Sequence, residues 1–435
     1  MEMLEYRKRR EGLMQHLGED GIAILPAAPE RPRNRDVHHP YRQDSDFFYL
    51  TGFNEPDAVA VLVPGREAGA YILFSRERDP DREVWQGRTI GQTAAVDVYG
   101  ADDAFPIDDI DDILPGLMEG RSKVYCTMGA DPEFDQRLIG WVNTLRSRAR
   151  SGVRVPMEYV ALEHVLHEMR LLKSRAEQSR MRYAARVTAA AHRRLLGVIR
   201  PGMREYEIEA ELLYDFRRHN GHPAYPVIAG SGANACVLHY IANQAELRPG
   251  ELILVDAGAE IDGYAADITR TLPVSGRFSA EQRAVYEVVL DAQRAALAQV
   301  RPGQHWNAGH EAATRVLTEG MVDLGLLSGS VDEALESGDY RRFFMHRTGH
   351  WLGMDVHDVG DYKVDGHWRE LEPGMVLTVE PGLYIPPGSD VDARWQGIGV
   401  RIEDDCLITR EGHENLTEAA PKAIDEIEAM MESAR

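Results

Sequence analysis

Length and composition limit the classes of protein that this sequence can represent. The chain has 435 residues, too many for one compact core, so we expect two or three domains. Hydrophobic residues make up 43% and charged residues 28%, an ordinary globular mixture. The formal net charge of −22 repels phosphate backbones, which argues against nucleic acid as a partner. We interpret the acidity as a solubility feature, although some of the excess carboxylates could bind cations.

The N-terminal segment is charged and has no apolar stretch, so we expect no secretory signal. No apolar run reaches the roughly 18 residues that a membrane span needs. The three cysteines, Cys126, Cys236 and Cys406, are odd in number and far apart, which fits neither a disulfide framework nor a cysteine metal knuckle. These features predict a cytoplasmic protein without a membrane partner.

Residues 1–172 combine short apolar runs with helical patterns, as is typical of an α/β domain. We expect strands at 21–25, 58–63 and 70–74, and helices at 3–18 and 133–148. The acidic run 101–112 is interpreted as a solvated loop followed by a helix start.

A second domain is expected to begin after residue 172. Ser174 and Glu177 have the spacing of a capping box, which satisfies two backbone amides at a helix start. A long helix should then continue to about Ile199. The expected organisation is therefore an α/β domain at 1–172 and a separate domain at 173–435.

The second domain contains a weak internal repeat. Arg-Pro-Gly occurs at 200–202 and again at 301–303, each time between a long helix and an amphipathic helix. Strand-like segments follow in both cases. This order indicates two related α/β halves, and a site between them would take residues from both.

Residues 251–274 have the pattern of a β-hairpin whose turn is Asp262-Gly263. With this turn, Asp256 faces Thr269, and Asp267 lies diagonally on the same face at about 7–8 Å or somewhat less between Cβ atoms. A pair of metal ions could fill that span, and aspartates in apolar strands are costly to bury without such partners. Two hairpin-edge aspartates that face water are an equally weighted alternative.

Further candidate ligands lie in the second half of this domain. The segment 344–358 contains three histidines. Glu380 ends an apolar strand within 375–385, and Glu403 lies inside another expected strand at 397–409. A single strand-edge glutamate usually reaches solvent, but four carboxylates in strands together with a histidine cluster indicate a metal site.

The ligand types favour one class of metal site over others. His346 and His350 are four residues apart, as in single-zinc protease helices, but Arg347 and Gly349 do not fit that motif. An oxygen-rich set suits Mn²⁺ better than ions that prefer thiolates, although Zn²⁺ or Co²⁺ could occupy it. The sequence lacks a serine-hydrolase elbow, a Walker loop and a dinucleotide-binding glycine motif.

With these motifs in place, the sequence resembles the pita-bread metallopeptidases, and among them bacterial aminopeptidase P (Xaa-Pro aminopeptidase). The matching segments of the second domain are LVDAGAEIDGYAADITRT, GHWLGMDVHDVG, LEPGMVLTVEPGLYI and GIGVRIEDD. The first domain contributes RQDSDFFYLTGF and REVWQGRTIGQ, so the likeness covers nearly the whole chain. The resemblance implies an α/β (α+β) protein in which an N-terminal α/β domain precedes a pita-bread catalytic domain with halves related by a pseudo-twofold axis.

The resemblance also implies a dinuclear site with two divalent metal ions. Asp256 would bind one ion, Asp267 and Glu403 would bridge both, and His350 and Glu380 would complete the second. The ions would lower the pKa of a shared water, so that a bridging hydroxide attacks the carbonyl of the first residue of a peptide.

The implied reaction releases the N-terminal residue from peptides that have proline in second position. His239 and His357 would be non-ligand histidines beside the scissile amide, and His357 would help stabilise the oxyanion. Glu380 is the candidate for moving a proton to the proline nitrogen. The pocket for the proline ring is expected from His239, His346, Tyr384 and Arg401.

Trp85 is a candidate for assembly. Its plain interpretation is a core or groove aromatic. In tetrameric relatives, an aromatic at the matching place reaches a neighbouring subunit's active site. The resemblance therefore implies a homotetramer in which residues 1–172 mediate contacts and limit substrate access.

Three alternatives stay open at this point. Prolidase, a dipeptidase with the same five ligands, differs in how it limits substrate length. A creatinase-like hydrolase of the same fold would have lost metal ligands, and here all are present. A non-catalytic pita-bread binding module is the alternative from another class of protein.

Overall fold

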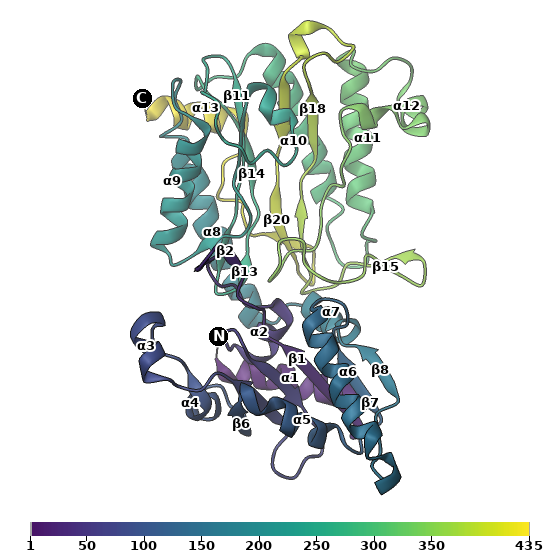
Figure 1. The fold of residues 1–435 in the computed structure, drawn as a ribbon. Coiled ribbons are helices and arrows are strands. Elements are labelled where there is room, and N and C mark those ends of the chain that lie inside the picture. Colours follow the sequence, from purple (N-terminus) through teal and green to yellow (C-terminus); the bar gives the residue numbers. More distant parts are fainter. Residues whose placement is uncertain (1, 435) are drawn as a thin grey trace. The chain divides into compact units, whose positions relative to one another are not determined.

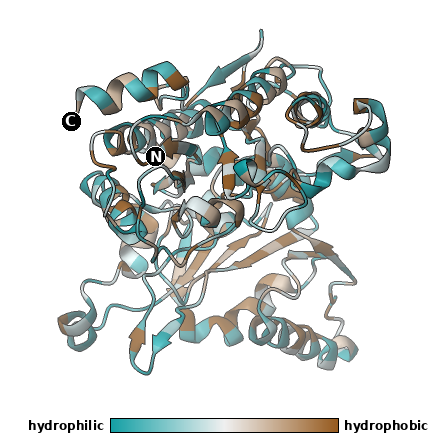
Figure 2. Cartoon of the chain, turned by 90° about the horizontal axis from the view of Figure 1, so that it is seen from above, coloured by the Kyte–Doolittle hydropathy of each residue, from teal (hydrophilic) through white to brown (hydrophobic). Residues whose placement is uncertain are grey.

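The structure, a computed structural model, describes residues 2–434. The chain divides into two compact units, Met1–Met169 and Arg170–Arg435. Among the described residues, no helix has both the length and the hydropathy needed to cross a membrane. Hydrophobic residues are concentrated on the strands, whereas the helices carry both hydrophilic and hydrophobic residues along their length (Figure 2).

The first unit is built around one six-stranded mixed sheet (Figure 1). Its strands, in spatial order, are β6 (Asp103–Pro106), β5 (Tyr71–Ser75), β4 (Val59–Leu62), β1 (Gly21–Pro26), β7 (Lys123–Cys126) and β8 (Glu158–Ala161). The central strand β1 pairs antiparallel with β4 and parallel with β7. The strands expected at 21–25, 58–63 and 70–74 are confirmed as β1, β4 and β5.

The acidic run 101–112 was only partly interpreted correctly. It contains β6, which pairs parallel with β5, and it reaches into α5. The half-buried strand was missed because its acidic residues lack an apolar alternation, and pairing with the buried β5 outweighs the weak propensity of aspartate for strands.

Helices cover the first sheet and complete its core. They are α1 (Met3–Leu17), α2 (Ser45–Thr51), α3 (Pro80–Gln86), α4 (Gly91–Asp97), α5 (Ile110–Met118), α6 (Pro132–Ser147) and α7 (Glu163–Leu171). Leu114 of α5 and Leu138 of α6 pack in one buried cluster with Ile24 of β1 and Phe74 of β5. A short exposed hairpin, β2 (Pro32–Asn34) and β3 (Val37–His38), lies outside this core.

The second unit contains two helix pairs and several short sheets (Figure 1). Its helices are α8 (Arg175–Leu195), α9 (Glu205–Arg218), α10 (Ala280–Leu297), α11 (Ala308–Asp323), α12 (Val331–Ser337) and α13 (Ile424–Ser433). The predicted capping box is present, because the Ser174 and Glu177 side chains each accept a hydrogen bond from the other residue's backbone amide. The helix that it starts ends at Leu195, slightly before the expected end.

The internal repeat is visible in backbone hydrogen bonds. Gly202 and Gly303, which end the Arg-Pro-Gly segments at 200–202 and 301–303, both have positive φ, at 89° and 78°. The Gly202 amide donates to the carbonyl oxygen of Leu247, and the Gly303 amide donates to that of Leu371, each at 2.9 Å. The expectation of two related halves is therefore confirmed.

Each half contains a hairpin that is interrupted in the same way. The first consists of β11 (Leu252–Asp256), β12 (Ala259–Ile261), β13 (Tyr264–Ala265) and β14 (Thr269–Pro273). The second consists of β17 (Val376–Val379), β18 (Gly382–Ile385), β19 (Ile398–Arg401) and β20 (Asp404–Ile408). The outer parts belong to the sheets β10-β11-β14 and β17-β20-β21, and the inner parts to β13-β12-β9 and β18-β19. The remaining strands are β9 (His222–Pro223), β10 (Ile228–Ser231), β15 (Lys363–Val364), β16 (His367–Trp368) and β21 (His413–Asn415).

The interruptions place the four carboxylates of interest where the ladders stop. Asp256 is the last residue of β11, and Asp267 lies between β13 and β14. Glu380 and Glu403 lie between β17 and β18 and between β19 and β20, so the expectation that Glu403 is inside a continuous strand was wrong. Strand periodicity did not reveal the break, because apolar residues continue on both sides of it.

Candidate metal centre

Three side chains from separate segments of the second unit converge on one point. Asp267, His350 and Glu403 each offer a ligand atom, and these atoms lie within 4.8 Å of one another. His350 is held beside β17, because its carbonyl oxygen accepts a hydrogen bond from the Thr378 amide at 3.0 Å. The cluster therefore takes one residue from the first hairpin and two from the second half.

The hydrogen bonds of His350 fix which ring nitrogen faces the cluster. Its Nδ1 lies 2.9 Å from the carbonyl oxygen of Trp351, so Nδ1 carries the hydrogen and donates it. Nε2 points the other way, 3.5 Å from Oδ2 of Asp267 and 3.7 Å from Oε1 of Glu380. Histidines that bind metals have this arrangement, with one nitrogen anchored to a carbonyl and the other free for the ion.

Asp256 lies beside Asp267, as the hairpin register predicted. The strands pair Asp256 with Thr269, and the turn residues Asp262 and Gly263 both have positive φ. The Tyr225 hydroxyl lies 2.6 Å from Oδ1 of Asp256 and 2.5 Å from Oδ1 of Asp267. The five residues expected as ligands therefore lie close together. His350 is near Asp267 and Glu380, Glu403 joins the cluster of Asp267 and His350, and Asp256 shares the Tyr225 hydroxyl with Asp267.

The crowding of acids gives the site its chemical character. Burial, together with the neighbouring carboxylates, raises the pKa of Glu403 and Asp256 and raises that of Glu380 to about 7. Burial alone would lower the pKa of His350, but Asp267 and Glu380 raise it to about 9. Bound divalent cations would relieve this repulsion, so the donor set fits hard metal ions.

A chain of hydrogen bonds runs from Asp256 through Arg401 and Tyr384 to His346. Arg401 donates from Nη2 to Oδ2 of Asp256 at 2.6 Å and from Nη1 to the Tyr384 hydroxyl at 3.0 Å. That hydroxyl lies 2.8 Å from Nε2 of His346. Burial and Arg401 lower the pKa of His346 to about 3, so this histidine is neutral. Tyr384 and Arg401 are buried, whereas His346 is partly exposed.

The two histidines expected beside the substrate are exposed. His357 packs its ring 4.3 Å from the ring of His350, centroid to centroid, at an interplanar angle of 67°. The partial desolvation of its ring, which remains although the residue is exposed, and the positive charge of His350 lower the pKa of His357. His239 acts in the same direction on both His357 and His346, so it belongs to this group.

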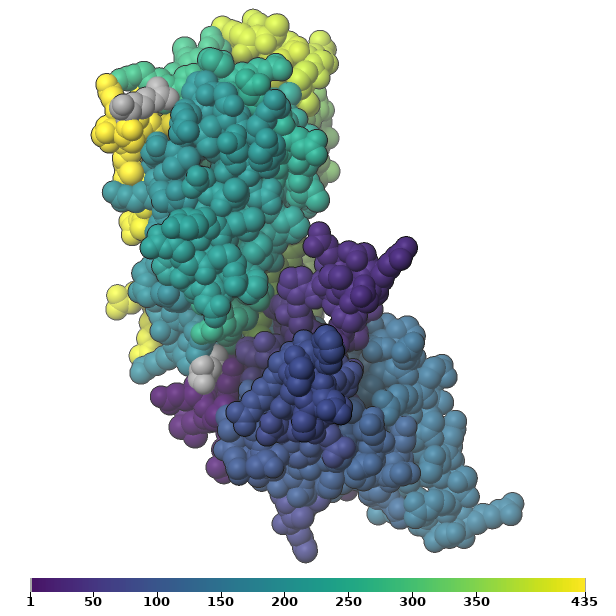
Figure 3. All heavy atoms as spheres, turned by 60° about the vertical axis from the view of Figure 1, so that its left-hand side comes forward, coloured from purple at the N-terminus to yellow at the C-terminus, as the bar shows by residue number. Residues whose placement is uncertain are grey.

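Trp85 lies in the other unit, on α3. Its side chain is 87% exposed, and that of its neighbour Val84 is 80% exposed. The segment that contains α3 forms part of the surface of the first unit (Figure 3). The interpretation of Trp85 as a core aromatic is excluded by this exposure.

Sequence models of known families match both units. The model of metallopeptidase family M24 matches residues 179–410, and the model of the aminopeptidase P N-terminal domain matches residues 6–125. The chain is 45% identical to Xaa-Pro aminopeptidase of Escherichia coli over 433 residues, which cover 99% of this chain and 98% of the relative. The chain belongs to metallopeptidase family M24. Its second unit accordingly has the pita-bread fold, and as a metallopeptidase it uses divalent metal ions and acts on peptides.

Other known proteins match nearly the whole chain. The chain is 35% identical to the mitochondrial intermediate cleaving peptidase 55 of Arabidopsis thaliana, covering 98% of this chain and 82% of the relative. The structure of Pseudomonas aeruginosa aminopeptidase PepP has a TM-score of 0.99 and 58% identity, covering 100% of this chain and 99% of that one. A glutamate-to-alanine variant of E. coli aminopeptidase P in complex with substrate has a TM-score of 0.97 and 44% identity, with coverage of 100% and 99%.

Several residues around the M24 centre escaped the sequence interpretation. Thr269 donates a hydrogen bond from its hydroxyl to Oε2 of Glu403 at 2.6 Å, a contact that its pairing with Asp256 could have suggested. The Asp405 carboxylate accepts a hydrogen bond from the Asp267 amide at 3.0 Å. Tyr225 lies in a separate segment before β10, and no spacing in the sequence connects it to the aspartates.

Proposed function

We propose that this protein is an aminopeptidase that releases the N-terminal residue from peptides with proline in second position. The observation that carries the proposal is the convergence of Asp267, His350 and Glu403 within 4.8 Å, in a chain that matches Xaa-Pro aminopeptidases over nearly its whole length. The match over both units, together with the complete donor set, supports an aminopeptidase rather than a binding module.

The roles of the ligands follow the resemblance to aminopeptidase P, and the convergence of Asp267, His350 and Glu403 supports them. Asp267 and Glu403 would bridge two divalent ions, Asp256 would bind the first, and His350 with Glu380 would complete the second. The oxygen-rich set favours Mn²⁺, with Zn²⁺ or Co²⁺ as alternatives. The bound ions supply a water of lowered pKa and positive charge near the scissile carbonyl.

The remaining residues bind and orient the peptide. His357 faces the position next to His350 and would donate a hydrogen bond to the carbonyl oxygen as negative charge develops there. Glu380 would carry a proton to the proline nitrogen, which as a tertiary amide has no hydrogen of its own before cleavage. His239 and His346 would contact the proline ring, while Tyr384 and Arg401 hold His346 and Asp256 in place.

We also propose a cytoplasmic homotetramer with contacts made through the first unit. The three cysteines are free, in agreement with a reducing compartment. Trp85 is a large, exposed aromatic residue on α3, and exposed tryptophans are enriched in interfaces. In the assembly, Trp85 would contribute to a neighbouring subunit's substrate pocket.

Three peptides test the proposed reaction. The metal-loaded protein should cleave Ala-Pro-Ala and release free alanine, and it should cleave Ala-Ala-Ala with a strongly reduced kcat/KM. Cleavage confined to the dipeptide Ala-Pro would instead identify a prolidase. Equal kcat/KM for Ala-Pro-Ala and Ala-Ala-Ala would reject proline selectivity altogether.

A further inference from the structure

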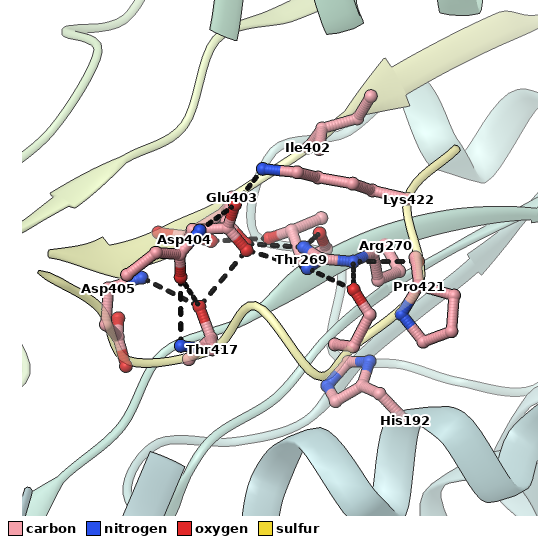
Figure 4. A network of polar contacts seen from close by, with 12 residues as sticks. His192, Thr269, Arg270, Ile402, Glu403, Asp404, Asp405, Thr417, Pro421 and Lys422 are labelled. Atoms are coloured by element: carbon pink, nitrogen blue, oxygen red, sulfur yellow. Dashed lines mark hydrogen bonds and ion pairs between the residues drawn. The ribbon is translucent and has the colours of Figure 1, made fainter. Parts of the chain in front are cut away.

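The three consecutive acids Glu403, Asp404 and Asp405 each have a different partner, and Figure 4 shows the acids beside Thr269 and Arg270. Glu403 accepts a hydrogen bond from the Thr269 hydroxyl at 2.6 Å. Asp404 accepts one from Arg270 at 2.7 Å, and Asp405 accepts one from the Asp267 amide at 3.0 Å. The segment 403–405 is thus attached side chain by side chain to the segment 267–270.

Arg270 is the centre of this attachment. It is 1% exposed and lies in β14, all of whose residues are buried. Its Nη1 donates to the carbonyl oxygens of Thr269 and Glu403, at 2.9 and 2.6 Å. Its Nη2 donates to Oδ1 of Asp404 and to the Ala420 carbonyl oxygen, at 2.7 and 2.8 Å. One planar guanidinium therefore spans the two segments that carry Asp267 and Glu403.

Asp404 is the buried counter-ion of Arg270. It is 0% exposed, and it also accepts hydrogen bonds from Lys422, Gln293 and Asn415. Arg270 and Lys422 thus place two cationic groups against this one carboxylate. A paired and fully hydrogen-bonded charge of this kind is held in one geometry.

The ladder pattern explains why such an attachment is needed. Strand β14 belongs to the sheet β10-β11-β14 and β20 to the sheet β17-β20-β21, and no ladder joins the two sheets within the residues described. Along this seam, one backbone hydrogen bond runs from the Glu403 amide to the Thr269 carbonyl oxygen at 3.1 Å. Asp267 and Glu403 are anchored on opposite sides of this seam. The distance between their carboxylates therefore depends on contacts across it, and the Arg270–Asp404 pair lies directly beside Glu403.

We propose that Arg270 and Asp404 are positioning residues that set the spacing between Asp267 and Glu403 before metal ions bind. The inference rests on the proposed assignment of these two carboxylates as bridging ligands. Neither Arg270 nor Asp404 touches the substrate. Their effect is on the affinity for metal, because a preformed spacing spares the cost of ordering two repelling carboxylates when the ions arrive.

Asp404→Asn and Arg270→Lys test the proposal. The first substitution keeps the shape of the side chain but removes its charge, and the second keeps the charge but removes the planar fork. Titration of the metal-free proteins with Mn²⁺ by calorimetry should show about 10- to 100-fold weaker binding in both variants, as is typical when the outer partner of a metal ligand is lost. With saturating Mn²⁺, kcat for Ala-Pro-Ala should return close to the wild-type value.

Lys422→Met is the matched control. It removes a second cation from Asp404 but leaves the contacts of Arg270 with Thr269 and Glu403 intact. This variant should have a lower Tm and an unchanged Mn²⁺ affinity. Wild-type affinity in folded Asp404→Asn and Arg270→Lys would overturn the proposal, and so would chains that stay unfolded even with saturating Mn²⁺, since the pair would then serve folding alone. Failure of the wild type and Glu403→Ala to differ in metal content would instead reject the ligand assignment.

Discussion

The hydroxyl oxygen of Tyr225 lies within hydrogen-bond distance of both Asp256 and Asp267, at 2.6 and 2.5 Å from their Oδ1 atoms. A phenol has one hydrogen and can donate it to only one carboxylate at a time. Tyr225 therefore holds two acids close together in the metal-free protein. Burial and these acids raise the pKa of Tyr225, so the hydroxyl keeps its hydrogen.

Tyr225→Phe should weaken metal binding without unfolding the chain. The ring keeps its packing, but the two aspartates lose the donor between them. We expect roughly tenfold weaker Mn²⁺ binding, at the lower end of the effect of losing an outer partner. Calorimetric titration measures the affinity, and an unchanged dissociation constant would show that the hydroxyl is irrelevant to the ions.

Loss of a bridging ligand should be more damaging than loss of a ligand to one ion. Asp267→Ala and Glu403→Ala should lose both ions, whereas Asp256→Ala should keep the one on the side of His350 and Glu380. The metal content of purified protein, measured by plasma mass spectrometry, separates these outcomes. The alanine variants should remain folded, because removal of one acid reduces repulsion in the buried cluster. Two ions retained in both bridging variants would refute the assignment.

Gly258→Ala should disrupt the first hairpin at its interruption. A Cβ atom there would lie 1.6 Å from the carbonyl oxygen of Ala266, a separation that backbone cannot tolerate. The segments that carry Asp256 and Asp267 would move apart, so we expect loss of metal and a lower Tm. Gly412→Ala is the control, because nothing lies within 4 Å of the added atom. Equal Tm and metal content in the two variants would contradict this account.

The buried cluster of Asp358 with Arg170 and Lys173 should make stability depend on acid pH. Arg170 donates to Asp358 at 2.6 Å and Lys173 donates at 2.9 Å. Burial alone would raise the pKa of Asp358, but the two cations lower it below its ordinary value. Its stabilising contribution is therefore complete above the unfolded pKa of about 3.9 and is lost as pH falls through the lower folded value.

Asp358→Asn tests this dependence. Breaking the buried cluster should lower the free energy of unfolding of the second unit by about 3–5 kcal/mol at pH 7. Guanidinium unfolding of the metal-free proteins should show this difference shrinking below about pH 4. Asp425→Asn is the control, because that carboxylate is almost fully exposed in its ion pair and its loss should change little. A difference independent of pH would exclude the linkage.

Trp85→Ala should weaken peptide hydrolysis and leave the bound metal unchanged. If Trp85 enters a neighbour's pocket, its removal should lower kcat/KM at least about tenfold, as for an interface anchor. Val84→Ala is a matched control at an almost equally exposed position on the same helix. Light scattering that finds a fully active monomer would reject the assembly, and equal kcat/KM in the two variants would remove Trp85 from the pocket.

The sequence predicted the hairpin of Asp256 and Asp267 because one turn determines its register. Asp262-Gly263 requires positive φ at both positions, and the observed pairing of Asp256 with Thr269 follows from that turn. The second hairpin has a longer connection between β18 and β19, so the turn did not reveal the register. Glu403 was therefore placed inside a strand that in fact stops before it.

Contacts between distant segments could not be predicted in this way. Tyr225 reaches the aspartates, and Arg270 reaches Asp404, through tertiary packing that leaves no periodic trace in the sequence. The available signal was an arginine inside the expected hairpin 251–274, since a buried Arg270 there required a partner. That signal indicates a partner must exist without identifying which acid it is.

The internal repeat has a further consequence for the centre. Gly250 precedes Asp256 by as many residues as Gly374 precedes Glu380, so these two acids occupy equivalent places in the halves. In the first half, Leu254 of β11 pairs with Gly230, while in the second the equivalent Thr378 is hydrogen-bonded to His350. Gly230 has no side chain that could bind a metal ion. The frame is close to symmetric, yet a single imidazole on one side would make the two ions chemically different.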